Sequence, residues 1–137
     1  MTEGGNLIEV ELVKIVIRDT SEQQYIFLKE KEGERVFPIV IGYFEASAID
    51  RHVRGEPTPR PMTHKILGDA IEALGGRLMR VLVTRLHENT FYAVLEIQQN
   101  ETVIPLDCRP SDAIALAVQS EAPIYVAEEV IEAVAGL

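Results

Sequence analysis

Hydrophobic and polar positions alternate at the start of the chain. In residues 8–18 the apolar residues Ile8, Val10 and Leu12 alternate with polar ones before the sequence becomes almost continuously β-branched. This pattern predicts a strand that passes from half-buried to buried. Residues 24–30 and 35–41 are two further apolar runs around a short polar segment, in which Gly33 can supply the positive φ of a tight turn. They predict a β-hairpin.

Helical spacing replaces this alternation after residue 42. Phe44, Ala48, Ile49 and Val53 follow the period of a short helix that ends at Gly55. Residues 56–61 contain three prolines, which predict an extended surface loop. A second helix is predicted to begin with Thr63 as its cap and to end at the glycines 75–76. Its amphipathic stripe consists of Ile66, Leu67, Ala70, Ile71 and Leu74.

The second half of the chain repeats the mixture of strands and helices. Residues 78–86, 91–98 and 103–107 predict an antiparallel meander, followed by a helix at 110–120, a short strand at 124–126 and a helix at 128–134. The predicted fold class is therefore α+β. We expect a mixed, largely antiparallel sheet of six or seven strands, with three or four helices packed on it. A single domain over residues 7–135 would follow a flexible N-terminus at 1–6.

Composition narrows the class of protein. The 137 residues are 47% hydrophobic and 26% charged, which is typical of a globular domain. No apolar run approaches the roughly 20 residues that a membrane-spanning helix needs, and the first residues do not resemble a secretory signal. The single cysteine, Cys108, cannot form an internal disulfide, and a reducing compartment fits best. We therefore expect a cytoplasmic protein without a membrane partner.

The charge is unevenly distributed. The chain carries a net charge of −9, which argues against strong non-specific attraction to nucleic acid. Residues 51–85, however, contain seven Lys and Arg against three acids, a local charge of +4 that leaves −13 for the rest. This segment could form an anion-binding face, or it could be an ordinary solvated helix and strand.

The densest group of chemical side chains lies in residues 107–112. Proline is favoured at the first helical position, so Pro110 begins a helix and Asp112 can bind free backbone N–H groups in its first turn. Capping does not explain Asp107 and Arg109, which precede the helix. An ion pair of Arg109 with Asp107 or with Asp112 could lock this turn. Alternatively, Asp107 and Asp112 could hold a divalent cation while Arg109 meets a phosphate.

Two other segments offer candidate site residues. Arg60, His64 and Lys65 lie around a predicted helix N-terminus, where anions bind readily. A neutral His64 could act as general base or as metal ligand, or its side chain could simply be solvated. Glu45 lies near another helix start, where the helix dipole alone favours an acid. Cys108 has no neighbouring base in sequence and is expected to pack as a small apolar residue. The common cofactor and hydrolase motifs, such as GxGxxG, GxxxxGK[ST], HExxH and GxSxG, are absent.

Three blocks together resemble the bifunctional nuclease domain family. They are "PIVIGYFEASAI" (38–49), "PRPMTHKILGDAIEALGG" (59–76) and "DCRPSDAIALAV" (107–118), and residues 90–93 and 122–126 also match, so the likeness extends over about residues 7–135. The resemblance implies a compact α+β domain that usually self-associates, in a family whose members are credited with degrading RNA and DNA. The motif positions that carry over are Glu45, Arg60, His64, Asp107, Arg109, Ser111 and Asp112.

Two functional hypotheses follow. The first is a nuclease acting on RNA or DNA, preferably single-stranded, with magnesium or manganese as cofactor and with self-association, a dimer being favoured. Its expected catalytic residues are Asp107, Asp112, His64 and Glu45, with Asp107 and Asp112 as metal ligands. Its expected substrate-binding residues are Arg60, Arg109, Lys65 and Ser111. The second is a non-catalytic module of the same fold that binds an anion or a protein.

Overall fold

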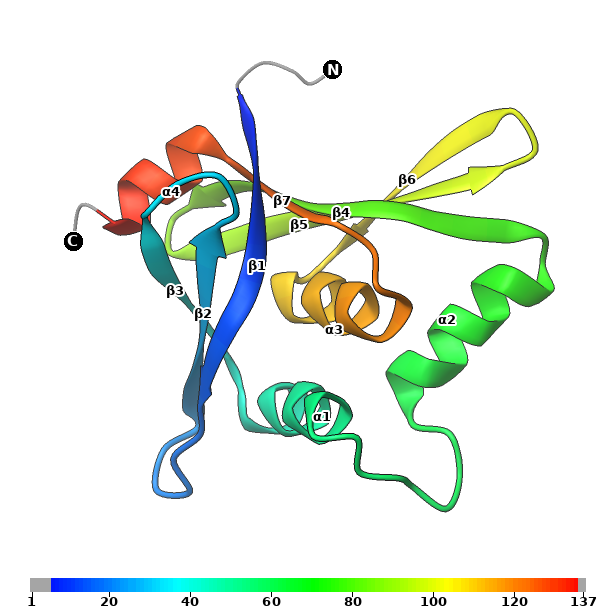
Figure 1. Ribbon diagram of the computed structural model, residues 1–137, viewed down its shortest axis with the longest axis horizontal. Coiled ribbons are helices and arrows are strands. Elements are labelled where there is room, and N and C mark those ends of the chain that lie inside the picture. Colours follow the sequence, from blue (N-terminus) through cyan, green and yellow to red (C-terminus); the bar gives the residue numbers. More distant parts are fainter. Residues whose placement is uncertain (1–5, 136–137) are drawn as a thin grey trace.

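The computed structural model describes residues 6–135, which form one seven-stranded sheet with four helices (Figure 1). The strands are β1 (Leu7–Val16), β2 (Gln23–Glu30), β3 (Val36–Gly42), β4 (Gly76–His87), β5 (Thr90–Gln99), β6 (Thr102–Cys108) and β7 (Ile124–Ala127). The helices are α1 (Tyr43–Val53), α2 (Thr63–Ala73), α3 (Pro110–Ser120) and α4 (Glu128–Ala135). The predicted α+β fold of a single domain is confirmed. Of the segment predicted to be flexible, residues 1–5 lie outside the described residues.

The sheet consists of two antiparallel groups that β7 joins. The strand order is β3-β2-β1-β7-β4-β5-β6. Strand β7 pairs antiparallel with β1 and parallel with β4, so that Ile124 lies opposite both Val10 and Val81. All other pairs are antiparallel, and the predicted meander of β4, β5 and β6 is confirmed. A segment from the end of the chain thus completes the centre of the sheet.

Helix α3 is the central helix of the fold. Its residues Ala113, Ile114, Ala115, Leu116 and Ala117 are all buried, because an almost continuous apolar run occupies the middle of the helix. It packs against α1 and α2 and against β3, β4 and β5. Figure 1 shows α3 beneath β4, with α1 and α2 beside it. The first turn of α3 is therefore held firmly in place.

Helix α2 differs from its prediction in two respects. The residue before the first turn is Met62, not Thr63, and no side chain caps the helix, so the prediction of a Thr63 cap is wrong. None of its residues is fully buried; Ile66 is 54% exposed, and Leu74, which directly follows the helix, is 75% exposed. The stripe is amphipathic as predicted, yet α2 contacts the body of the protein only through half-buried residues such as Leu67. No helix in the described part of the chain is long and apolar enough to cross a membrane.

Candidate functional site

A chain of hydrogen bonds joins the first turns of α1, α2 and α3. Glu45 in α1 accepts a hydrogen bond from Nη1 of Arg109 at 3.1 Å. Arg109, the residue before α3, donates through Nε and Nη2 to the two carboxylate oxygens of Asp112, at 3.0 and 2.8 Å. Oδ1 of Asp112 also lies 2.9 Å from Nε2 of His64 in α2. Four predicted site residues, three in the first turns of helices and one directly before α3, therefore form one network, Glu45–Arg109–Asp112–His64.

Asp112 is the centre of this network. Its Oδ2 also accepts the backbone N–H of Arg109 at 3.2 Å, which closes the first turn of α3 as a capping interaction. Burial by itself would raise the pKa of Asp112, but the hydrogen bonds from Arg109 and His64 outweigh it and lower the pKa to about 2. The carboxylate is therefore ionised at neutral pH and can only accept hydrogen bonds. Nε2 of a neutral His64 must then carry the proton, which leaves Nδ1 without one.

The guanidinium of Arg109 is both paired and accessible. Hydrogen bonding to Asp112, followed by that to Glu45, raises its pKa further above the ordinary value of arginine. Its three side-chain bonds use three of the five N–H groups of a guanidinium, and its side chain is 62% exposed. Two N–H groups thus remain available to an anion that approaches from solvent.

Gln119 is a positioning residue that the sequence did not reveal. From α3, its Nε2 donates to the backbone oxygen of His64 at 2.6 Å, which fixes the start of α2 against α3. The same atom lies 2.8 Å from where a Cβ at Gly68 would be, so a glycine permits this close approach of the two helices. The only signal in the sequence was a polar residue at the end of an apolar run, which is common on any helix.

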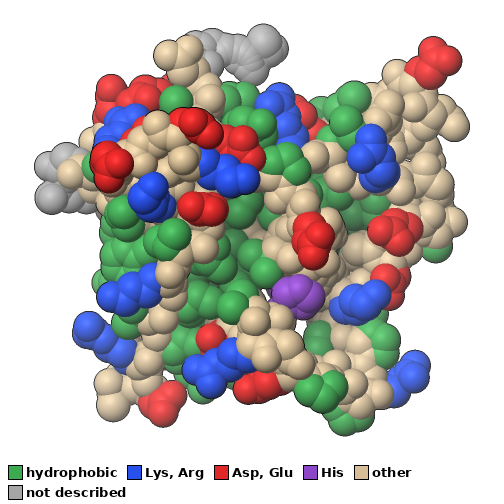
Figure 2. Space-filling view, in the orientation of Figure 1, with side chains coloured by type: hydrophobic (Ala, Val, Ile, Leu, Met, Phe, Trp, Pro, Cys, Tyr) green, Lys and Arg blue, Asp and Glu red, His purple; other side chains and the backbone are tan. Residues whose placement is uncertain are grey.

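A cavity of about 360 Å³ lies beside the network, between α1, the proline-rich loop, α2 and α3. His64 lines it, and so does Gln119. Its wall is apolar where Ile49, Met62 and Ala115 contribute, and basic where Arg60 reaches it from the loop. Figure 2 shows basic side chains on either side of the hollow between α1 and α2. The predicted extended loop, residues 56–61, thus forms one side of a pocket.

The remaining predicted site residues lie outside the network. Asp107 is an exposed residue of β6 opposite Val94, and within residues 6–135 no hydrogen bond or ion pair of its side chain is found. Lys65 lines the cavity but pairs with Asp69 one turn later in α2, at 2.6 Å. Ser111 is only 5% exposed in the first turn of α3. Of these three residues, only Lys65 is placed where a ligand of the cavity could reach it.

Cys108 packs against the hydrophobic core as a half-buried residue. Burial, followed by the negative charges of Asp112 and Asp107, raises the pKa of its thiol to about 12. Very little thiolate exists at neutral pH, and the thiolate is the nucleophilic form. The geometry therefore agrees with the expectation of a small packing residue.

The carboxylates do not form a ready cation site. Both oxygens of Asp112 accept hydrogen bonds from Arg109, and His64 shares one of them. Across residues 6–135, no group of three or more His, Cys, Asp or Glu side chains is placed to hold a metal ion. A divalent cation bound by Asp107 and Asp112 would have to displace a guanidinium from its carboxylate. The arrangement as it stands does not fit the predicted ion, and the cation stays a prediction.

The network and the cavity fall within the part of the chain that matches a known family. Residues 26–136 match the family described as the bifunctional nuclease domain. This match includes all of β3 to β7 and all four residues of the network. The chain belongs to the bifunctional nuclease domain family.

Individual relatives differ in how much is known of them. An uncharacterized protein of Mycobacterium tuberculosis, Rv1829, is 43% identical over 129 residues, which is 94% of this chain and 76% of that protein. Bifunctional nuclease 1 of Oryza sativa subsp. japonica is 29% identical over 132 residues, 92% of this chain but 40% of the rice protein. Bifunctional nuclease 2 of Arabidopsis thaliana is 29% identical over 106 residues, 74% of this chain and 32% of that protein. The relatives named as nucleases thus extend well beyond the matched domain.

Proposed function

We propose that this protein is a nuclease that hydrolyses phosphodiester bonds of single-stranded RNA or DNA at the network Glu45–Arg109–Asp112–His64. The observation that carries the proposal is the contact between His64 and the ionised Asp112, with an accessible Arg109 on the same carboxylate. A base, a group that orients it and a cation for phosphate are the parts that such a hydrolysis needs. Membership of a family with relatives named as nucleases supports the same reaction.

His64 is suited to act as the general base. Because Nε2 donates to Asp112, Nδ1 holds the free lone pair that can accept a proton from a water molecule. The water oxygen then attacks phosphorus, the ester P–O bond breaks, and the departing oxygen takes a proton from solvent. Asp112 does not touch the substrate in this scheme. It orients the imidazole and stabilises the imidazolium that forms.

Arg109 and Arg60 would bind the phosphate. The two unused N–H groups of Arg109 can contact the non-bridging oxygens, where negative charge develops in the transition state. Arg60, at the end of the proline-rich loop, has no ion-pair partner within residues 6–135 and is free to turn toward an anion. These cations offset locally the repulsion that a net charge of −9 exerts on nucleic acid. The scheme uses no metal ion.

A cleavage assay tests the proposal. Labelled single-stranded RNA and DNA would be incubated with the wild-type protein and with His64→Ala and Asp112→Asn, each in magnesium, in manganese and in EDTA. Loss of a general base typically lowers a rate by about 10²- to 10⁴-fold, and we expect a loss in this range for His64→Ala. His87→Ala, an exposed histidine at the end of β4, is the matched control and should cleave like the wild type.

The same assay also distinguishes a nuclease from a non-catalytic module. The same network joins three helices, so it could serve only to hold α1, α2 and α3 together in a non-catalytic module that binds an anion or a protein. In that case no cleavage would accompany the purified protein, or cleavage would be equal in wild type and both variants and thus come from a contaminant. Cleavage in EDTA would exclude a required divalent cation, whereas cleavage only with magnesium or manganese would support the predicted ion.

We also propose that the protein forms a homodimer in the cytoplasm. The edge strand β6 exposes Val103, Ile104 and Leu106, which are 51%, 39% and 45% accessible. An apolar strand at a sheet edge with free backbone groups favours pairing with another chain. Sedimentation analysis of the wild type and of Leu106→Lys tests the proposal. A monomeric wild type at micromolar concentration would refute it.

A further inference from the structure

We propose that the cavity under the proline-rich loop is a nucleotide subsite, which receives one unpaired base of the strand next to the phosphate bound at His64. This inference rests on the proposed function and names the substrate more closely. It follows from the size of the cavity, from its division into an apolar and a basic side, and from the position of His64.

The size of the cavity fits one nucleotide. Small-molecule sites typically enclose about 300–1,000 Å³, and the value of about 360 Å³ lies at the lower end of this range. Pro57, Pro59 and Pro61 all line it. Because proline has a fixed φ, the loop loses little conformational freedom when a ligand binds, and its rings offer flat apolar surface. The cavity is thus suited to a small, flat and partly apolar group.

The two sides of the cavity suit the two ends of a nucleotide. Met62 and the three prolines provide exposed apolar surface against which a base can pack, while Ile49 and Ala115 are buried residues of the core that close the cavity. Arg60 is the cation at the rim that is free of ion pairs in residues 6–135, since Lys65 is paired with Asp69 and Arg51 lies 3.9 Å from Glu56. The phosphate would therefore stay at the rim while the base enters.

His64 links the subsite to the reaction. Its side chain lines the cavity and also contacts Asp112, the carboxylate that Arg109 holds, so a phosphate at this imidazole would lie beside the cavity. A base that is stacked and paired in a duplex cannot enter the cavity, because recognition inside a pocket requires the base to leave the stack. The subsite would therefore give the proposed nuclease a preference for single strands.

Binding of mononucleotides tests the inference without any need for cleavage. AMP, adenosine and ribose 5-phosphate would be titrated against the protein by calorimetry. We expect AMP to bind more tightly than adenosine and more tightly than ribose 5-phosphate. Ala48→Leu, which fills the cavity from α1, should weaken AMP at least tenfold, whereas Ala70→Leu on the exposed side of α2 should leave it within twofold. Arg60→Ala should weaken AMP and ribose 5-phosphate but not adenosine, and as an exposed substitution it leaves the fold intact.

The outcomes distinguish the subsite from the nuclease. If AMP binds the wild type and Ala48→Leu equally, or does not bind at all, the subsite is refuted even where His64-dependent cleavage is observed. If AMP binding depends on Ala48 and Arg60 but no strand is cleaved, the nucleotide site stands and the nuclease proposal fails. If both hold, Ala48→Leu should also reduce cleavage of single strands by about the same factor as it reduces AMP affinity.

Discussion

Replacing Asp112 by Asn should destabilise the protein in a pH-dependent manner. The substitution keeps the shape of the side chain but removes the charge that accepts hydrogen bonds from the Arg109 side chain and His64. The NH₂ group of the new Asn side chain would also face the N–H donors of Arg109 and His64. Hydrogen bonds to charged groups are worth about 1.5–3 kcal/mol each in favourable settings, although coupled bonds do not add.

The pKa of Asp112 sets the size and the sign of the effect. Its value of about 2 lies below the 3.8 of an unperturbed aspartate, so the ionised form stabilises the folded state. One pKa unit corresponds to 1.36 kcal/mol, which gives an upper bound of about 2.4 kcal/mol and, after screening by solvent, about 1–2 kcal/mol. Because the folded pKa is depressed, this contribution is fully present above pH 3.8 and is lost as the pH falls through about 2.

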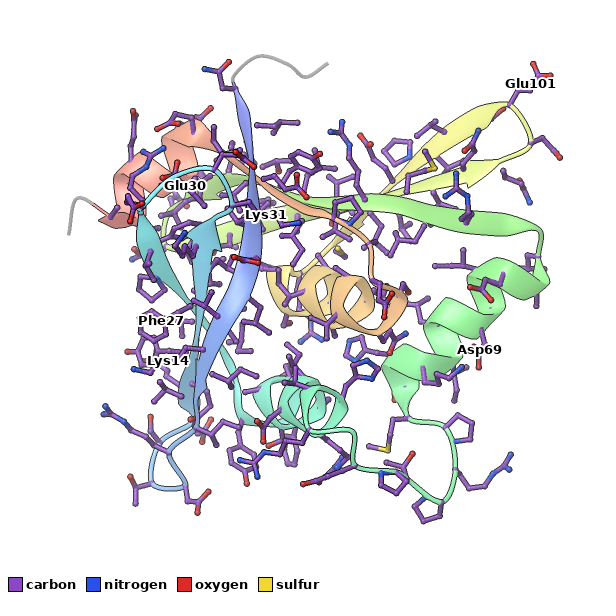
Figure 3. All side chains as sticks on the ribbon, viewed as in Figure 1. Lys14, Phe27, Glu30, Lys31, Asp69 and Glu101 are labelled. Carbon is purple, nitrogen blue, oxygen red and sulfur yellow. The ribbon has the colours of Figure 1, made fainter. Side chains whose placement is uncertain are left out.

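Urea unfolding provides the measurement. Free energies of unfolding of wild type and Asp112→Asn would be compared at pH 7 and in steps down to pH 2.5. We expect a difference of about 1–2 kcal/mol at pH 7 that shrinks below pH 4. The matched control is Asp69→Asn, whose exposed pair with Lys65 should contribute less than about 0.5 kcal/mol. Figure 3 shows Asp69 on the outer side of α2. Equal destabilisation by both variants, or a difference that does not change with pH, would show that the ionised carboxylate of Asp112 does not stabilise the fold.

Three further predictions concern other parts of the molecule. The pKa of the Cys108 thiol is raised to about 12, so Cys108 should react with iodoacetamide at pH 8 far more slowly in the folded protein than in the urea-unfolded chain. Equal reaction rates would contradict the burial of this thiol. Leu116→Ala should lower the free energy of unfolding by about 2–5 kcal/mol, because the side chain is 0% exposed at the centre of α3; a loss below 1 kcal/mol in urea unfolding would count against this packing. Glu121→Gly should raise stability by about 0.5–1 kcal/mol, because Glu121 ends α3 with a left-handed φ of 57°, and thermal unfolding that shows no increase would argue against strain there.

Individual helices and strands could be predicted from the sequence because each depends on residues that are neighbours in the chain. Pro110 begins α3 and Asp112 closes its first turn, both as the sequence predicts. The position of β7 could not be read in this way. Residues 124–126 predict a strand, but only tertiary packing decides that this strand lies between β1 and β4.

The site was predictable only in part, because the sequence indicates single residues at helix starts but not the contacts between them. His64 and Asp112 each stand out beside a helix start, yet nothing in their spacing of 48 residues indicates a contact at 2.9 Å. Asp107 stands out equally in sequence, but within residues 6–135 no hydrogen bond or ion pair joins its side chain to the network. The chemical groups are evident in the sequence, whereas the packing of α1 and α2 on α3 decides which of them meet.

The location of β7 has a consequence for how the protein is made. Strands β1 to β3 and β4 to β6 pair with near neighbours in the chain, so each group can form early during synthesis. The two groups become one sheet only when residues 124–127 pair with both β1 and β4. Of the seven strands, β7 is the last to leave the ribosome, since nascent chains emerge from the N-terminus. Until then the facing edges of β1 and β4 are exposed, and a stall or premature stop before residue 124 releases two open half-sheets that can pair with other chains.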